Sequence, residues 1–311
     1  MRVTTAQLST TLAREMNAAS RRHIDDWNRV ASGERISQPS DDPLGSVGQN
    51  AILREIDRIE GYQNNTSMLH IQLQHEDVLL QSYGTVLDQV RQLVLQANSG
   101  VVSVEEMQVL SLTVDAWIET LVNLLNTRSS EEGVYLFAGT QSDRAPVERQ
   151  DDGSFLCNHN DTVREVSVAE GIRIAGWDTA ETLSFNLPVS SESNLSFNIL
   201  DQLQTLRCVL SSSPLSQALF CETIAQTLER LDVALERLRG MHARLGMRMR
   251  MLETFASNHR RILLEYRKNL SHIIDLDYPK TLSRINSQEL ALDAARQGIS
   301  RISSLSLFNY L

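Results

Sequence analysis

The longest helical pattern in the chain constrains its fold most. Between residues 217 and 273, mainly apolar side chains recur at alternating four- and three-residue intervals for eight heptads, and no proline interrupts them. This spacing is typical of a long helix that packs in coiled-coil fashion. At 1.5 Å per residue such a helix is roughly 85 Å long. A compact enzyme has little use for an element of this length, so the pattern favours an elongated protein.

Two further segments repeat the heptad pattern. Residues 44–98 carry it for about six heptads, and residues 104–130 carry it over a shorter stretch. The short link between them, which begins Asn98-Ser-Gly100, predicts two antiparallel helices. We expect the three heptad helices to bury their apolar stripes against one another, because each buried leucine contributes roughly 1.5–3 kcal/mol. Residues 195–210 predict one more short helix.

The pattern changes at Gly133, where the sequence predicts a small β insertion over residues 134–194. The apolar run Val134–Gly139 indicates a strand, and further strands are expected at 154–157, 162–168 and 171–174. The Asp-Gly pair that ends at Gly153 favours a hairpin. An insertion of this size is marginal by itself, so it should pack on the helices.

The two ends of the chain predict amphipathic helices, over about 4–31 and 280–305. Their apolar stripes have no partner in the heptad bundle, so we expect them to pack on each other and on neighbouring copies of the chain. The predicted assembly interface comprises Leu8, Leu12, Met16, Ala19, Trp27, Val30, Leu282, Ile285, Leu292, Ala295, Ile299, Ile302 and Leu305.

The predicted fold is mainly α: a long, antiparallel, coiled-coil-like bundle with a small β insertion and paired terminal helices. Three parts are expected, namely the terminal helices (1–42 with 275–311), the helical bundle (43–133 with 195–274) and the β insertion (134–194). Aromatic residues make up only 5% of the chain, which suits a thin bundle better than a broad core.

Composition excludes several classes of partner. The formal net charge of −10 argues against nucleic acid or an anionic membrane surface. No segment approaches 18 consecutive apolar residues, and the N-terminus has no cleavable signal pattern. By these rules the protein would stay in the cytoplasm, unless export uses a route that needs no cleaved signal.

Four groups of residues carry a possible chemistry beside a structural interpretation. The arginines at 239, 244, 248 and 250 suggest a phosphate site or a solvated helix face. Cys157 and His159 suggest a metal fragment, but no second pair lies at ligand spacing. The pair Asp41–Asp42 suggests an acid/base couple, or a helix start where Ser40 or Asp41 is the N-cap. Asp275 and Asp277 suggest a cation site or a helix stop and restart. Phosphate-loop and nucleophile-elbow motifs are missing, so we predict no enzyme and no cofactor.

Motifs at both ends resemble those of the bacterial flagellin family. The loop Ala31–Pro43 resembles its N-terminal signature, and the segments Arg244-Leu-Gly246 and Asp277-Tyr278 resemble its C-terminal motifs. Within the family, Gln38–Pro43, Val134–Gly139 and the ending Leu305–Leu311 favour proteins of the hook–filament junction over filament flagellin. The matching positions of the signature loop are Ser32, Gly33, Arg35, Ile36, Asp41 and Asp42.

This resemblance implies a secreted structural adaptor of the bacterial flagellum. Its expected partners are copies of itself, the first hook-associated protein and flagellin, together with an export chaperone and the type III export apparatus, which needs no cleaved signal. Two alternatives remain open: a short filament flagellin, or a cytoplasmic coiled-coil adaptor or signalling protein. The second alternative explains the long helices but leaves the motifs at both termini without a role.

Overall fold

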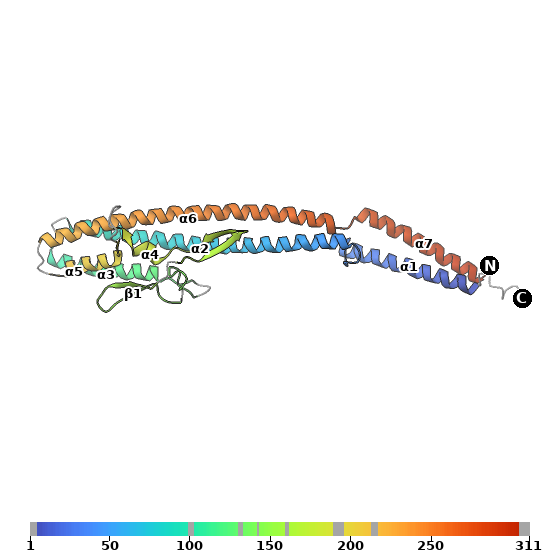
Figure 1. Ribbon diagram of the computed structural model, residues 1–311, viewed down its shortest axis with the longest axis horizontal. Coiled ribbons are helices and arrows are strands. Elements are labelled where there is room, and N and C mark those ends of the chain that lie inside the picture. Colours follow the sequence, from blue (N-terminus) through green and yellow to red (C-terminus); the bar gives the residue numbers. More distant parts are fainter. Residues whose placement is uncertain are drawn as a thin grey trace. The chain divides into compact units, whose positions relative to one another are not determined.

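The computed structural model describes residues 5–98, 103–129, 133–141, 143–158, 162–188, 196–212 and 217–304. The helices are α1 (Thr5–Ser32), α2 (Pro43–Ala97), α3 (Val104–Leu125), α4 (Ala180–Ser184), α5 (Ile199–Ser211), α6 (Gln217–Ile274) and α7 (Tyr278–Ser304). The strands are β1 (Val147–Arg149), β2 (Phe155–Cys157), β3 (Glu165–Ala169), β4 (Ile172–Ala175), β5 (Leu187–Pro188) and β6 (Ser196–Phe197). The predicted fold class, a mainly helical bundle with a few short strands and paired terminal helices, is confirmed (Figure 1).

The chain divides into two compact units. The terminal unit contains Met1–Glu60 and Arg260–Leu311, and the central unit contains Gly61–His259. The boundaries fall inside the two longest helices, α2 and α6, rather than at the loops used for the three-part division predicted from sequence. The division into terminal helices, helical bundle and β insertion stays a prediction.

One hydrophobic core holds the central unit together. The heptad side chains of α2 and α6 meet in it, and Leu73, Leu80, Leu231 and Leu245 are fully buried. Polar contacts fix the alignment of the two helices, since the Arg91 guanidinium donates to Asp232 at 2.7 Å. Helix α3 packs against α5, so the short helix completes the bundle. The apolar heptads therefore bury one another as their spacing predicts.

The β insertion shares this core. Strands β1 and β2 form an antiparallel hairpin across Asp152 and Gly153, and β3 and β4 form a second one. Val147, Phe155, Val168 and Ile174 are buried in the same cluster as the helical leucines. An insertion too small to be stable alone is thus stabilised by the helices, as expected from its size.

The predicted strand at Val134–Gly139 is wrong. Only Tyr135 forms a single bridge, to Arg128, and the rest of the run turns. The Leu136 N–H donates to the Thr127 carbonyl, so this segment pairs with the residues that follow α3 rather than with a strand. Leu136 and Phe137 are buried in the core. The apolar run therefore reflects burial in a turn and not a sheet.

Two helix ends also differ from the predicted bounds. Helix α3 ends at Leu125, because the Asn126 side chain both donates to the Val147 carbonyl and accepts from the Val147 N–H. Helix α5 begins only at Ile199, because Asn198 is its N-cap and the two preceding residues pair in β6. Asn198 starts α5 by accepting from the Leu200 N–H, whereas the Asn126 side chain ties the end of α3 to β1.

Candidate functional site

The terminal helices α1 and α7 lie side by side in the terminal unit (Figure 1). Of the predicted interface residues, Ile285 and Leu292 are buried, and Leu12, Met16, Ala19, Val30, Ala295 and Ile299 are half-buried. Trp27 is 49% exposed and Leu282 is 42% exposed. Leu305 and the side chains of Leu8 and Ile302 lie outside the described part of the chain. The pair thus covers one side of its apolar surface and leaves another side open.

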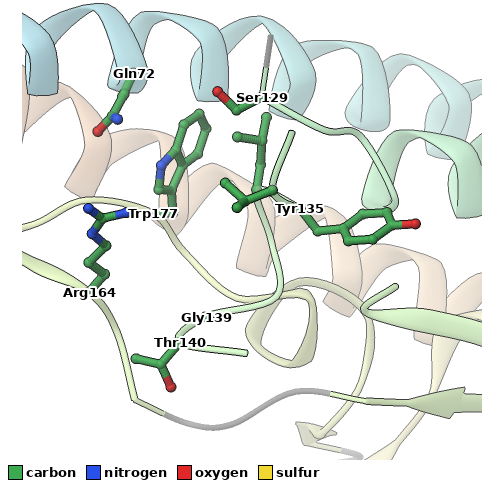
Figure 2. A pocket seen from close by; sticks show the side chains of 9 residues that line it. Gln72, Ser129, Tyr135, Gly139, Thr140, Arg164 and Trp177 are labelled. Carbon is green, nitrogen blue, oxygen red and sulfur yellow. The ribbon is translucent and has the colours of Figure 1, made fainter. Parts of the chain in front are cut away.

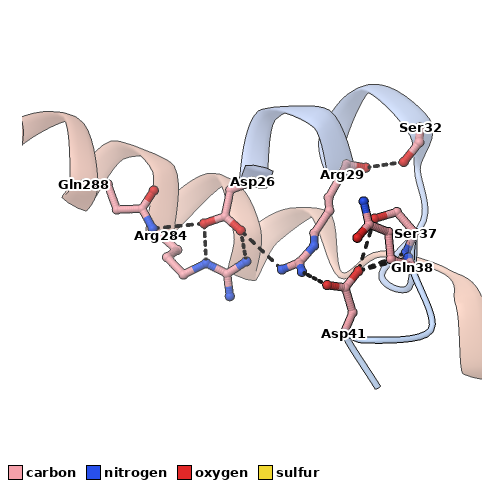
Figure 3. Close-up of polar contacts among 8 residues, drawn as sticks. All are labelled: Asp26, Arg29, Ser32, Ser37, Gln38, Asp41, Arg284 and Gln288. Atoms are coloured by element: carbon pink, nitrogen blue, oxygen red, sulfur yellow. Dashed lines mark hydrogen bonds and ion pairs between the residues drawn. The ribbon is translucent and has the colours of Figure 1, made fainter. Parts of the chain in front are cut away.

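A polar cluster, absent from the sequence prediction, ties α1 to α7 (Figure 3). The carboxylate of Asp26, only 4% exposed, accepts two hydrogen bonds from Arg284, at 2.6 and 2.8 Å. The Gln288 amide donates to the same carboxylate at 2.9 Å. Arg29 lies 3.7 Å from Asp26 and extends to Asp41 at 3.3 Å, which connects the helix pair to the signature loop. A bidentate arginine–carboxylate pair fixes geometry as well as charge.

The electrostatics of Asp26 favour its ionised form. Burial by itself would raise the pKa of this carboxyl group, but the hydrogen bonds from Arg284 and Gln288 and the charges of Arg284 and Arg29 hold it below its usual value. A helical repeat could have revealed the residue, because Ala19, His23, Asp26 and Val30 fall on one stripe. A carboxylate in an otherwise apolar stripe signals a partner on the facing helix.

The signature loop joins the end of α1 to the break between α6 and α7. Gly33, with φ +77°, adopts the left-handed conformation that ends α1, and its carbonyl accepts from the Leu276 N–H. Arg35 donates from its guanidinium to the Ile273 carbonyl at 3.0 Å, and its backbone N–H donates to the Ile274 carbonyl. These bonds satisfy carbonyl groups that the end of α6 would leave without partners. Ser32 accepts from the Glu34 N–H, and Ile36 is buried.

The two adjacent aspartates of the loop have separate structural contacts. The Asp42 carboxylate accepts from the Gly45 N–H at 2.9 Å and is therefore the N-cap of α2, which corrects the assignment to Ser40 or Asp41. Asp41 accepts from the backbone N–H of Gln38 and from the N–H and hydroxyl of Ser37. The Gln38 hydrogen bond, with the contacts from Ser37 and Arg29, holds the pKa of Asp41 below its usual value. Asp41 therefore folds the loop on itself.

Asp277 is the corresponding cap of α7. Its carboxylate accepts from the Lys280 N–H at 3.1 Å, and its carbonyl accepts from the Thr281 N–H. Helix α7 starts at Tyr278, two residues before the predicted start, so Pro279 lies in the first turn, where its missing N–H costs little. The Asp275–Asp277 pair is a helix stop and restart in this structure.

Glu76, Asp178 and Arg248 form a buried ionisable cluster in the central unit. Glu76 is fully buried, and its carboxyl group accepts from the Asp178 N–H at 2.9 Å. The Arg248 guanidinium donates to the Asp178 carboxylate at 2.8 Å and lies 3.9 Å from Glu76. Burial, followed by the nearby charge of Asp178, raises the pKa of Glu76 to about 8. This cluster connects α2, α6 and the segment after β4.

A cavity of about 240 Å³ is lined in part by Trp177, the residue before Asp178 (Figure 2). It is lined by Gln72, Tyr135, Thr140, Arg164 and Trp177, together with Ser129, Val134, Leu136 and Gly139. Trp177 makes edge contacts with His75 and Phe137, which fix its ring. Among the described residues that line it, the cavity has a cation and hydroxyl groups but neither a cysteine nor a carboxylate.

The remaining chemical candidates do not converge. In the described part of the chain, no three His, Cys, Asp or Glu side chains form a metal-binding group, and no helix is long and apolar enough to cross a bilayer. Cys157 is half-buried, and His159 lies outside the described residues. Of the four clustered arginines, Arg248 pairs with Asp178. The other three, Arg239, Arg244 and Arg250, are exposed.

Comparison with known proteins supports the family resemblance that the signature loop indicates. Residues 3–142 match the model of the bacterial flagellin N-terminal helical region. The resemblance to the flagellin family is confirmed. Flagellar hook-associated protein 3 of Escherichia coli (strain K12) is 22% identical to this chain over 288 residues, which cover 90% of each of the two proteins.

Solved structures show that the flagellin-type fold extends beyond the N-terminal match. Flagellar hook associated protein-3 from Legionella pneumophila has a TM-score of 0.67 at 18% identity, over 72% of this chain and 98% of that one. The flagellar junction protein FlgL from the same organism has a TM-score of 0.59 at 18% identity, over 73% of this chain and 99% of that one. At these identities the structural likeness establishes the fold.

Proposed function

We propose that this chain is a structural component of the bacterial flagellum that acts at the junction between hook and filament. The observation that carries the proposal is the terminal unit, in which the signature loop joins the paired helices α1 and α7 to the end of α6. The match to the flagellin N-terminal region covers α1, the loop, α2 and α3. The relative named as a flagellar junction protein supports the position within the flagellum.

In this proposal the terminal helices are the assembly element. The open side of the α1–α7 pair, with Trp27 and Leu282, contacts neighbouring copies, and the signature loop holds the pair at the end of the long helices. Contact with a neighbouring copy buries Trp27 and Leu282, and burial of apolar surface favours association. The division into terminal helices, helical bundle and β insertion belongs to the same proposal.

The partners follow from this position. The first hook-associated protein lies on the hook side and flagellin on the filament side, with further copies of the chain beside it. Before assembly, an export chaperone holds the chain, and the type III apparatus exports it to the cell exterior without a cleaved signal. The protein has a structural role and catalyses no reaction.

Seeded assembly tests the proposal. Purified full-length protein is added to isolated hooks that carry the first hook-associated protein, and growth is followed by electron microscopy. A junction protein adds a short zone and stops. Long fibres would instead identify a short filament flagellin, and a failure to bind hooks would support a cytoplasmic adaptor.

Truncated chains provide the control. Removal of residues 1–30 or 282–311 should leave the central unit folded, as judged by circular dichroism, but unable to add to hooks. Incorporation of either truncated chain at the level of the full chain would contradict the assembly role of the terminal helices.

A further inference from the structure

One exposed face of α6 in the central unit combines arginine and methionine. Its members recur every three or four residues and therefore lie on one side of the helix. This arginine–methionine face comprises Arg237, Gly240, Arg244, Met247 and Met251. Met247 is 60% exposed and Met251 is 47% exposed. Two large, flexible apolar side chains on the outside of a long helix are adaptable contact groups rather than core residues.

The N-terminal half of this face is hollow. A groove of about 280 Å³ is lined by Pro188, Val233, Glu236, Arg237, Gly240 and Arg244. A side chain at position 240 would meet no atom within 4 Å, so the glycine leaves room on the face. The groove holds two guanidinium groups and one carboxylate, and its charge is therefore positive.

Helix α3 of the same unit carries an exposed face of the opposite charge. This acidic face comprises Glu105, Val109, Leu112, Ala116 and Glu119, again at three- and four-residue spacing. Val109 is 62% exposed and Leu112 is 71% exposed. The apolar side chains lie in the middle of the face, and a glutamate stands at each end.

The two faces have equal length and opposite charge. Each covers 15 residues of helix, or about 21 Å from its first residue to its last. When the faces are aligned end to end in the same direction, Arg237 lies opposite Glu105 and Arg244 lies opposite Leu112. One is positive with two methionines, and the other is negative with valine and leucine at its centre. They lie on different helices, α6 and α3, and each is exposed to solvent in this chain. Because the whole chain has a net charge of −10, copies repel unless unlike local charges meet.

We propose that the arginine–methionine face of α6 in one copy binds the acidic face of α3 in the next copy. Such a contact joins two different surfaces and is heterologous, which is the contact type that closes a ring or continues a helical tube. The inference rests on the proposed junction function, because that function requires copies of the chain to lie side by side. It adds to the terminal helices a second, central contact.

Charge reversal tests this contact. Full-length Arg237→Glu and Glu105→Arg, at the facing ends of the two surfaces, are each expressed in cells that lack the native protein, and junctions that contain the variant are counted on isolated flagella. Each single variant should reduce their number at least about tenfold, because it places like charges together. The double variant, in which both charges are exchanged, should restore most of them. Double-variant numbers no higher than those of the single variants would overturn the proposal.

Two controls separate the contact from other effects. Arg239→Glu makes the same charge change on an exposed residue of α6 outside the face, and it should leave assembly unchanged. Both test residues are at the surface of the unit, so the melting temperatures of the variants should equal that of the parent protein. Loss of assembly by Arg239→Glu equal to that of Arg237→Glu would show a general charge effect and contradict a specific contact.

Cross-linking provides a direct second readout. In a chain whose native cysteines are replaced by serine, Met247→Cys and Ala116→Cys variants are mixed and oxidised on flagella. A dimer that contains one copy of each variant is expected. If the parent protein lies at the junction but no mixed dimer forms, the contact is wrong and the proposed function stands; if the parent protein is not at the junction, the proposed function itself fails.

Discussion

Glu76→Gln should increase stability at alkaline pH, and the size of the effect follows from the buried cluster. Glu76 is fully buried, one of its oxygens has no hydrogen-bond partner, and Arg248 is 2.8 Å from Asp178 but 3.9 Å from Glu76. The arginine thus neutralises Asp178 first, and burial together with the Asp178 charge raises the pKa of Glu76 from 4.5 to about 8.

The sign of the pH dependence is fixed by linkage. Between pH 4.5 and 8 the folded protein holds a proton on Glu76 that the unfolded chain has released, so the free energy of unfolding falls as pH rises through this range. At 1.36 kcal/mol per pKa unit the whole shift corresponds to about 4–5 kcal/mol. Glutamine resembles the protonated acid in shape and does not ionise. The variant should therefore match the parent protein near pH 4.5 and exceed it by several kcal/mol above pH 8.

Urea unfolding followed by circular dichroism at pH 5, 7 and 9 measures this difference. Glu229→Gln, an exposed change on α6, is the matched control and should shift no curve. A parent protein whose stability relative to Glu76→Gln stays constant from pH 5 to 9 would refute the buried, protonated state of Glu76.

Three further substitutions test separate parts of the fold. Leu235→Asp places a carboxylate in the core, where Leu235 is 6% exposed, and should lower the free energy of unfolding by more than about 3 kcal/mol; an unchanged melting temperature would refute the heptad packing. Asp26→Ala leaves Arg284 and Gln288 without their acceptor and should destabilise the α1–α7 pair by about 1–3 kcal/mol, which faster hydrogen exchange of α1 and α7 amides would report; unaltered exchange would count against the cluster. Burial lowers the pKa of His259, which stacks on Tyr62 and Phe255, so the folded state disfavours protonation and stability should fall as pH drops below about 6.5. His259→Phe should lose part of this acid sensitivity between pH 7.5 and 5 in thermal melts, and equal sensitivity in both proteins would exclude His259 as its source.

The long helices could be predicted from sequence because their signal is repeated many times. The apolar residues of α2 and α6 recur over whole heptads, and a single exception, such as Glu76 in the stripe, does not hide the period. The predicted bounds of both helices agree with the structure to within one residue at each end. Helix α1 likewise begins and ends within one residue of its prediction.

The β insertion was harder to predict from sequence, because its strands are short and the residues that hold them lie elsewhere in the sequence. Strand β1 has three residues, and its first residue, Val147, is held by Asn126 at the end of α3. The Val134–Gly139 run has the composition of a strand, but its apolar side chains are buried by turning over the core. Local sequence cannot distinguish these two ways of burying the same residues.

The polar contacts of the candidate site were the least predictable. Asp26 and Arg284 are far apart in sequence, and neither residue type indicates a partner by itself. The signature loop was found through its resemblance to a family, but the specific contact of Arg35 with the end of α6 required the structure. A charged residue in an apolar stripe was the available sequence signal, and it applies to Asp26 as well as Glu76.

Locating the chain on the flagellum is the measurement that tests the junction function most directly. Gold-labelled antibodies against the full-length protein are applied to isolated flagella that retain their hooks, and the label is located by electron microscopy. A single narrow zone of label between hook and filament is expected. Label along the whole filament, or on no part of the flagellum, would contradict the function proposed for this chain.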